Sequence, residues 1–182
     1  MAAGLVDVAV DIVDTGAASF PVSLCVWAAA DEVAAGRTVV QSATVARATA
    51  TRTGSLFVVG VPELARRGGR FVSVDGDLTP TSILELVDGT IRDHARVADL
   101  DTAIDLMIDH TLRIAREEPI RVGVGHAMRD TVAERLAAGL EHRPGIEALT
   151  VYEVGPSVGA HTGPDTIGVV YAPVVRCRSR RG

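Results

Sequence analysis

The sequence predicts an α/β fold made of two parts: a partial parallel α/β lobe, followed by an α+β lobe in which helices cover a mixed or antiparallel sheet. Three observations carry this prediction. Strand and helix patterns alternate over the first 67 residues, and beyond Arg70 short strand patterns follow one another. Asp88-Gly89 joins two of these strands and is a strong signal for a hairpin turn. Hydrophobic residues make up 47% of the 182 residues, which is enough for a substantial core.

The first lobe is predicted at residues 1–69. Ser19 is a good helix N-cap, and Pro21 follows in the first turn, where proline is tolerated. Gly36 ends this first helix and Gly54 ends the next. The expected elements are a strand at 5–13, helices at 20–35 and 38–53, a strand at 55–59 and a short helix at 62–67.

The second lobe is predicted at residues 70–175, and residues 176–182 form a basic tail. Asp99 or Asp101 caps its first helix, Pro119 breaks the pattern, and Asp130 caps the next helix. The expected elements are strands at 71–74, 82–87 and 90–97, a helix ending near 116, a strand at 120–124, a helix at 130–140, and strands at 149–154 and 166–175.

The charged residues exclude several function classes. The formal net charge is −5, whereas a general nucleic-acid-binding protein is usually basic. All 18 basic residues are arginines, so Schiff-base chemistry and a P-loop lysine are excluded. No serine stands in the G-x-S-x-G pattern of a hydrolase. The sequence therefore argues against a general nucleic-acid-binding protein, an enzyme that depends on a lysine and a serine hydrolase.

The spacing of the cysteines and the length of the apolar segments indicate whether the protein binds a metal and where in the cell it is located. Cys25 and Cys177 lie far apart in the sequence, in no spacing typical of zinc ligands, so neither a metal nor a cofactor is predicted. No apolar run reaches the ~18 residues that a membrane span needs, and no signal peptide pattern opens the chain. We therefore expect a soluble, cytoplasmic protein.

Segment 154–164 is the strongest candidate for a ligand site, because glycines and prolines surround His161 directly after a predicted strand. Glycine and proline favour a turn, and a turn can present backbone N–H groups and an imidazole to a small anion such as a carboxylate or a phosphate. The alternative is a tight turn with a solvated histidine.

Within this segment the expected ligand contacts differ in kind. His161 donates a hydrogen bond from its ring, and Thr162 offers a hydroxyl. Gly159 and Gly163 offer backbone N–H groups, and Ser157 can point either way.

Other residues are weaker candidates. His126 ends a strand, a place where ligands bind in α/β folds, although a histidine hydrogen-bonded within a turn explains it as well. Arg70 follows two glycines and either reaches the interface between the lobes or pairs with an acid. Asp109 and Arg113 are expected to form an ion pair on a solvated helix face. Three further histidines are expected on the surface without partners: His94, His110 and His142.

Several different short motifs are distributed over most of the chain. They are Asp14-Thr15 before the Ser19 helix, Leu64-Ala65-Arg66-Arg67-Gly68-Gly69-Arg70, Leu86-Val87-Asp88-Gly89-Thr90-Ile91 with Ala95-Arg96-Val97, Gly123-Val124-Gly125-His126-Ala127, and the segment from Glu153 to Pro164. The last is the most specific and resembles G-P-x-x-G-A-H-x-G-P-G. In this order the motifs resemble the DegV family of bacterial fatty-acid-binding proteins.

The resemblance implies a two-lobed protein that holds a long-chain fatty acid in an apolar tunnel, with its carboxylate at the interface of the lobes. It implies that His161 contacts the carboxylate and that a separate ATP-dependent kinase phosphorylates this carboxylate, so that the binding protein itself is not an enzyme. Arg96, on the family's basic strand, then meets the kinase or the acyl phosphate, unless it is a solvated strand arginine.

The sequence departs from the family pattern in three places. The family carries a further segment before Asp7, with turns whose Thr and Ser hold the carboxylate, so the chain is expected to be an N-terminally shortened member. The segment after Arg70 is short, and Asp165 replaces the last glycine of the signature. A carboxylate at this position would attract a protonated His161 or repel a bound anion. The alternative to a fatty-acid-binding protein is an interaction or structural remnant that binds no lipid.

Overall fold

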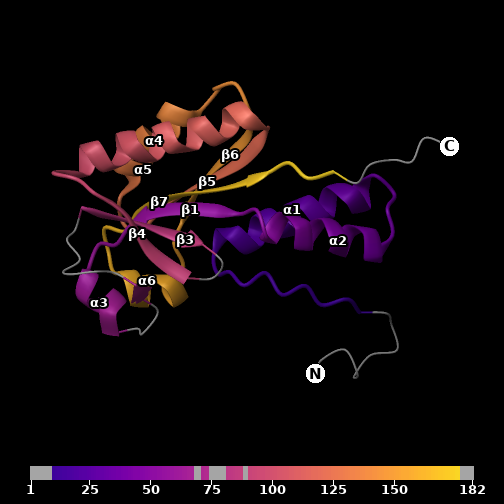
Figure 1. The fold of residues 1–182 in the computed structure, drawn as a ribbon, viewed down its shortest axis with the longest axis horizontal. Helices are drawn as coiled ribbons and strands as arrows, with labels where there is room; N and C mark the ends of the chain where they lie inside the picture. The colour runs from indigo at the N-terminus through magenta and orange to yellow at the C-terminus, as the bar shows by residue number, and fades with distance from the viewer. Residues whose placement is uncertain (1–9, 68–70, 74–80, 88–89, 177–182) are drawn as a thin grey trace.

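The computed structural model describes residues 10–67, 71–73, 81–87 and 90–176. These residues form one sheet with helices on both faces (Figure 1). Six helices pack around it: α1 Phe20–Ala34, α2 Val39–Ala50, α3 Pro62–Arg67, α4 Leu100–Glu117, α5 Asp130–Leu140 and α6 Pro156–Thr162. Figure 1 shows α4 and α5 on one side of the sheet and α3 and α6 on the other, while α1 and α2 extend past the ends of the strands.

Seven described strands form the sheet in the order β2-β4-β3-β1-β7-β5-β6. They are β1 Gly54–Val58, β2 Phe71–Ser73, β3 Ser82–Val87, β4 Thr90–Arg96, β5 Ile120–His126, β6 Ile146–Glu153 and β7 Ile167–Pro173. The pairs β2–β4 and β5–β6 are parallel and the other neighbouring pairs are antiparallel. The predicted mixed sheet covered by helices is thus confirmed.

Strand β1 lies in the middle of this sheet, between β3 and β7, and runs antiparallel to both. A strand from the predicted first lobe therefore shares a sheet with strands from the second. The predicted boundary and Arg70 fall within residues 68–70, which lie outside the described residues, so the division into lobes stays a prediction. The hairpin turn at Asp88-Gly89 also lies outside them, but Val87 pairs with Thr90 as a hairpin requires.

The main core lies between the sheet and helices α4 and α5. It contains Val122 and Val124 of β5 and Val169 of β7, packed against Met107 of α4 and Leu136 of α5. Because side chains alternate along a strand, the neighbouring residues of β7 face the other way. There Leu24 of α1 packs on a smaller cluster that includes Val170 and Ala172.

Two glycines on β5 let aromatic rings lie flat on the strand. A Cβ at Gly123 would meet the ring of Phe20 at 2.3 Å, and one at Gly125 would meet the ring of Tyr152 at 2.5 Å. These two rings stack with centroids 4.5 Å apart and planes 12° apart. The start of α1 is thereby placed against β5 and β6.

Helix starts show which predicted caps form. The side chain of Asp99 accepts a hydrogen bond from the N–H of Thr102 at 2.8 Å, which lowers the pKa of Asp99. The prediction that Ser19 caps α1 is wrong, because Ser19 has φ 64° and makes no capping hydrogen bond. Its side chain hydrogen-bonds Tyr152 instead. Asp130 is the first residue of α5, and the cap position belongs to Arg129.

The first predicted strand does not form in its described part. Residues 10–13 pair with no described strand. Their contact is with α2: the guanidinium of Arg47 binds the Asp11 carboxylate and donates to the carbonyl of Ile12 at 3.0 Å. Alternation of apolar and acidic residues is typical of a strand at a sheet edge, but here the segment runs along a helix. Among the described helices, none is both long and apolar enough to cross a membrane.

A buried arginine joins α1 to the sheet. Arg121 of β5 is 8% exposed, and its guanidinium carbon lies 4.4 Å from the centroid of the Trp27 ring. One terminal nitrogen donates to Asp31 of α1 at 2.5 Å and to Glu147 of β6 at 2.8 Å. Burial disfavours the charge, but the hydrogen bonds to these two carboxylates outweigh it and raise the pKa of Arg121.

We expect Arg121→Leu to lower the free energy of unfolding by about 2–3 kcal/mol, because it leaves two partly screened carboxylates without their cation and removes the contact with Trp27. The matched control is Arg135→Leu. Arg135 also pairs with two carboxylates, Asp101 and Asp105, but its side chain is 44% exposed and those of its partners are 78% and 68% exposed. That change should cost about 0.5 kcal/mol or less. Urea denaturation of both variants measures the difference, and equal losses would contradict the proposed role of Arg121.

Candidate functional site

The predicted ligand segment lies where several strands of the sheet end, and this side of the sheet is called its edge below. Strands β1, β5 and β6 end there and β7 begins, as the pairing of Ile167 with both Val58 and His126 shows. Helix α6 follows β6 at this edge and packs beside α3, which follows β1 (Figure 1).

Segment 154–164 is a short helix between two turns, so the prediction of one tight turn is wrong. Pro156 stands in the first turn of α6, where its missing N–H costs no hydrogen bond. Gly163 ends the helix with φ 81°, a conformation that favours glycine. Glycine and proline mark the two ends of the helix, and the residues between them make helical hydrogen bonds.

The end of α6 is fixed to the end of β1. The N–H of Val61 donates to the carbonyl of Thr162 at 3.0 Å. The buried hydroxyl of Thr166 donates to the carbonyl of Gly163 at 2.8 Å and accepts from the N–H of Gly60 at 3.2 Å. A Cβ at Gly60 would lie 1.4 Å from the carbonyl oxygen of Pro164, so only glycine fits there.

His161 lies in the last turn of α6 and is half-buried. Within the described part of the chain, its imidazole makes no hydrogen bond and no ion pair. The adjacent Thr162 donates its hydroxyl to the carbonyl of Val158 at 3.2 Å. Ser157 is exposed.

The two glycine N–H groups predicted as anion donors are used within the helix. Gly159 donates to the carbonyl of Gly155 at 3.0 Å, and Gly163 donates to that of Gly159 at 2.8 Å. A ligand would have to compete with these hydrogen bonds. In this arrangement His161 is the better placed donor.

His126 lies at the same edge but is held by its neighbours. It is 9% exposed, and its Nδ1 accepts a hydrogen bond from the N–H of Arg129 at 3.4 Å and lies 3.2 Å from the carboxylate of Asp130. Its carbonyl accepts from the N–H of Val154 at 2.8 Å. This is the local hydrogen-bonded arrangement that the sequence left as an alternative to ligand binding.

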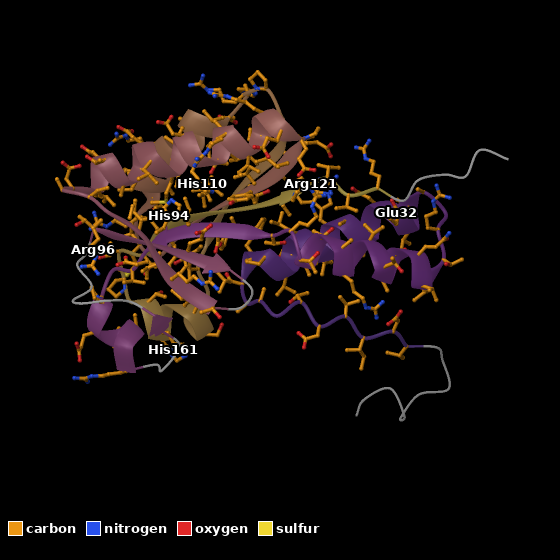
Figure 2. The ribbon with its side chains drawn as sticks, viewed as in Figure 1. Glu32, His94, Arg96, His110, Arg121 and His161 are labelled. Carbon is orange, nitrogen blue, oxygen red and sulfur yellow. The ribbon has the colours of Figure 1, made fainter. Side chains whose placement is uncertain are left out.

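Arg96 lies elsewhere on the sheet. It ends β4 and donates to Asp93 at 2.7 and 2.9 Å. Because β3, β1 and β7 lie between β4 and β5, the structure does not bring Arg96 next to His126. Figure 2 shows it apart from His161 as well.

Asp165, which replaces the last glycine of the signature, has a partner of its own. Its carboxylate accepts from the Nε of Arg129 at 2.6 Å, and its N–H donates to the carbonyl of Ala127 at 2.9 Å. The carboxylate is thus committed to Arg129 and makes no ion pair with His161.

A second cluster of polar side chains lies between β4 and α4, and the prediction that His94 and His110 lack partners is wrong. His94 Nδ1 lies 3.2 Å from the carboxylate of Glu85. His110 Nε2 lies 2.9 Å from the hydroxyl of Tyr171, and Arg113 lies 2.9 Å from His110 Nδ1. The predicted hairpin brings Glu85 near His94, but the contact with Tyr171 joins residues far apart in the sequence.

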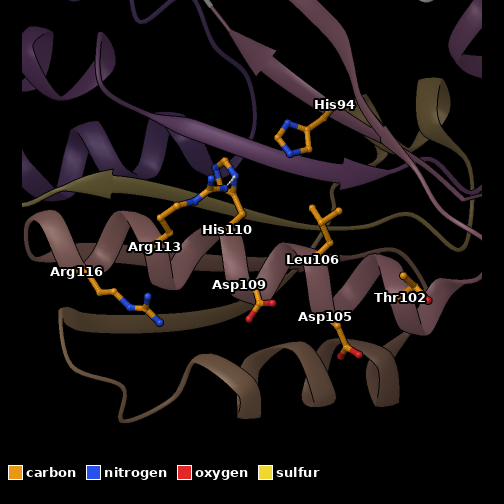
Figure 3. A pocket seen from close by; sticks show the side chains of 8 residues that line it. All are labelled: His94, Thr102, Asp105, Leu106, Asp109, His110, Arg113 and Arg116. Carbon is orange, nitrogen blue, oxygen red and sulfur yellow. Dashed lines mark hydrogen bonds between the residues drawn. The ribbon is translucent and has the colours of Figure 1, made fainter.

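These histidines open onto a cavity of about 730 Å³ (Figure 3). Its lining consists of His94, Thr102, Asp105, Leu106, Asp109, His110, Arg113 and Arg116. None of the predicted ligand residues that the structure describes belongs to this lining. Nor do the described residues contain a group of three or more His, Cys, Asp or Glu side chains that could hold a metal ion.

Comparison with known proteins gives a consistent result. A family model described as an uncharacterised protein of the DegV family matches residues 1–174. A curated DegV domain-containing protein of Streptomyces coelicolor is 34% identical over 168 residues, which cover 90% of this chain and 60% of the relative. The chain therefore spans about 60% of the length of this relative.

Solved structures show the same fold. A DegV family protein from Corynebacterium glutamicum has a TM-score of 0.81 and 19% identity, covering 97% of this chain and 69% of the other. A DegV family protein from Thermus thermophilus, described for its fatty acid binding, has a TM-score of 0.81 and 22% identity, covering 90% of this chain and 60% of the other.

We expect Gly60→Ala to lower the free energy of unfolding by at least about 2 kcal/mol, because the new methyl group collides with the backbone of Pro164 and must separate β1 from α6. The control is Gly155→Ala at the start of α6, where an added Cβ meets no atom within 4 Å and φ is −66°. That change should cost less than about 1 kcal/mol. Chemical denaturation checks both, and an unchanged midpoint for Gly60→Ala would contradict the described junction.

Proposed function

The chain belongs to the DegV family, and on this premise we propose that it binds a long-chain fatty acid whose carboxylate accepts a hydrogen bond from His161. The observation that carries the proposal is that this imidazole is partly buried and has no hydrogen-bond partner among the described residues. It is half-buried on a helix that is fixed at its end to β1, yet no described residue hydrogen-bonds it. A rigidly placed donor without a partner is what recognition of a carboxylate requires.

The residues beside His161 border the head-group site in this proposal. The hydroxyl of Thr162 and the N–H groups of Gly159 and Gly163 reach the ligand only by giving up their hydrogen bonds within α6, and the exposed Ser157 lies on the same helix. The further hydroxyl ligands that the family resemblance implies would come from a segment that precedes Asp7 in the family. We therefore assign His161 to one part of a shared carboxylate site.

Most of the affinity would come from the acyl chain. Burial of about 0.8 kcal/mol per methylene makes a long chain bind tightly, whereas the carboxylate contacts give orientation. The Thermus thermophilus relative, described for its fatty acid binding, supports this choice of ligand class. In this proposal the aliphatic side chains, which are abundant in the sequence, line the groove that holds the acyl chain.

We further propose that the protein presents the carboxylate to a separate kinase and performs no chemistry itself. In this proposal it acts in the cytoplasm of a bacterium, and Arg96 or Arg70 contacts the kinase. Arg96 is exposed at the end of β4, which suits a contact with a partner.

The second candidate function is an interaction or structural module that binds no lipid. The observation in its favour is the apolar surface of the α1–α2 pair. Four valines there are exposed, each by about three fifths: Val26, Val33, Val39 and Val40. Apolar side chains grouped on two neighbouring helices are typical of a surface that another segment or protein covers.

Replacement of His161 by alanine tests the leading proposal. We expect native mass spectrometry to find a co-purified fatty acid on the unmodified chain and to lose it in His161→Ala. One hydrogen bond to a charged group is worth about 1.5–3 kcal/mol, which weakens binding about 10- to 100-fold.

The control is His142→Asn. His142 has a side chain 90% exposed and φ 58°, a conformation that asparagine tolerates. It should retain the fatty acid. If the unmodified chain carries no lipid and binds none from added oleate, the interaction module is favoured. If lipid is bound equally by His161→Ala, the assigned role of His161 is wrong.

A further inference from the structure

The polar cluster between β4 and α4 fixes the protonation state of one histidine. Arg113 remains protonated in proteins and can only donate, so His110 Nδ1, 2.9 Å away, must accept. A neutral imidazole with an accepting Nδ1 carries its proton on Nε2 and donates it to the hydroxyl of Tyr171 at 2.9 Å. Arg113 is therefore held in place by an uncharged partner.

The charge of Arg113 has no acidic counterpart in the described part of the chain. The ion pair expected with Asp109 does not form, because Arg113 turns toward the sheet and His110. Figure 3 shows Asp105 and Asp109 pointing away from His94 and His110. Asp105 is bound to Arg135 at 3.1 Å, and Glu85 is engaged by His94.

The cavity lining contains two arginines of α4, Arg113 and Arg116, and Figure 3 shows them on different sides of this helix, with only Arg113 reaching His110. Arg116 lies one turn beyond Arg113 and, among the described residues, also has no carboxylate partner. A guanidinium uses one of its five N–H groups to hold an imidazole and keeps the others for a ligand. Its planar fork matches the two oxygens of a carboxylate or a phosphate.

We propose that the cavity of about 730 Å³ between β4 and α4 binds a small oxyanion, a carboxylate or a phosphate group, through the guanidinium of Arg113, with His94 on the same side of α4 (Figure 3). The ligand neutralises the arginine that the protein itself leaves without an acid. His110 and Tyr171 are positioning residues, since they fix the guanidinium without touching the ligand. The site is independent of the proposed fatty-acid site, because α4 and α6 lie on opposite sides of the sheet (Figure 1).

The pKa shifts of His110 and Tyr171 indicate which groups of the cluster are charged. Burial lowers the pKa of His110, and the nearby His94 and Arg113 lower it further against the opposing charge of Glu85. Burial, together with Glu85, raises the pKa of Tyr171 to about 12. Both residues thus stay uncharged at neutral pH, and the positive charge that contacts His110 is that of the exposed Arg113.

The test is a titration of the full chain with inorganic phosphate or with acetate, followed by NMR of the histidine side chains at neutral pH. Sodium chloride keeps the ionic strength constant, so that general screening does not move the signals. We expect saturable shifts of the His94 and His110 resonances. Comparison of the dissociation constants for phosphate and acetate shows which of the two ligand classes the site prefers. Shifts that sodium chloride alone reproduces would overturn the proposal.

The decisive variant is Arg113→Gln, which should weaken binding at least about tenfold and should raise the pKa of His110, because one of the charges that lowers it is gone. Arg113→Lys keeps the charge without the planar fork of the guanidinium and should bind with intermediate strength.

The control is Arg143→Gln, which removes an exposed charge on the turn after α5 and should bind as the unmodified chain does. Equal binding by Arg113→Gln would refute the site, whereas unchanged phosphate binding by His161→Ala would separate it from the fatty-acid proposal.

Discussion

The buried guanidinium of Arg121 is the constraint on which much of the arrangement depends. A charge that is 8% exposed must be matched, and its partners come from two different elements, Asp31 on α1 and Glu147 on β6. Helix α1 is therefore held at one position on the sheet, where the rings of Phe20 and Tyr152 fill the space above two glycines of β5. Since α6 begins three residues after β6 ends, the position of β6 also determines where His161 lies.

The candidate head-group site combines a rigid frame with one unpartnered side chain. Thr166 and Gly60 join the end of α6 to β1 through hydrogen bonds and backbone contact, and such a junction leaves little freedom to relax. Around it, polar groups are paired: Asp165 with Arg129, and His126 with its own turn. The imidazole of His161, which no described residue hydrogen-bonds, differs from these paired groups, and this difference is the basis for proposing it as the ligand contact.

How much the sequence could predict depends on whether the signal is local. The bounds of α3 and β3 agree with their prediction, because proline, glycine and apolar runs mark them within a few residues. The strand predicted at 5–13 does not form over its described residues 10–13, since alternation does not reveal which element lies beside a segment. Ser19 does not cap α1, since its side chain hydrogen-bonds Tyr152, far along the chain. The motif around His161 marked the candidate site, but its helical backbone and the occupied N–H groups of its glycines depend on three-dimensional hydrogen bonding. The cluster of Arg113 and His110 was missed for the same reason, because Tyr171 completes it from another strand.

The hydrogen-bond capacity of a carboxylate explains why His161 cannot form the whole head-group site. A carboxylate has two oxygens with about four acceptor positions, and burial leaves each unfilled position costly. His161 can fill one of them. The N–H groups of Gly159 and Gly163 already donate within α6, and the hydroxyl of Thr162 already donates to Val158.

A buried fatty-acid head group would therefore take its remaining hydrogen-bond donors from water or from protein outside α6. The relatives described above are longer than this chain, which spans about 60% of one of them, and the additional length offers room for such donors. The donor count therefore supports the proposal that His161 forms one part of a site shared with another segment.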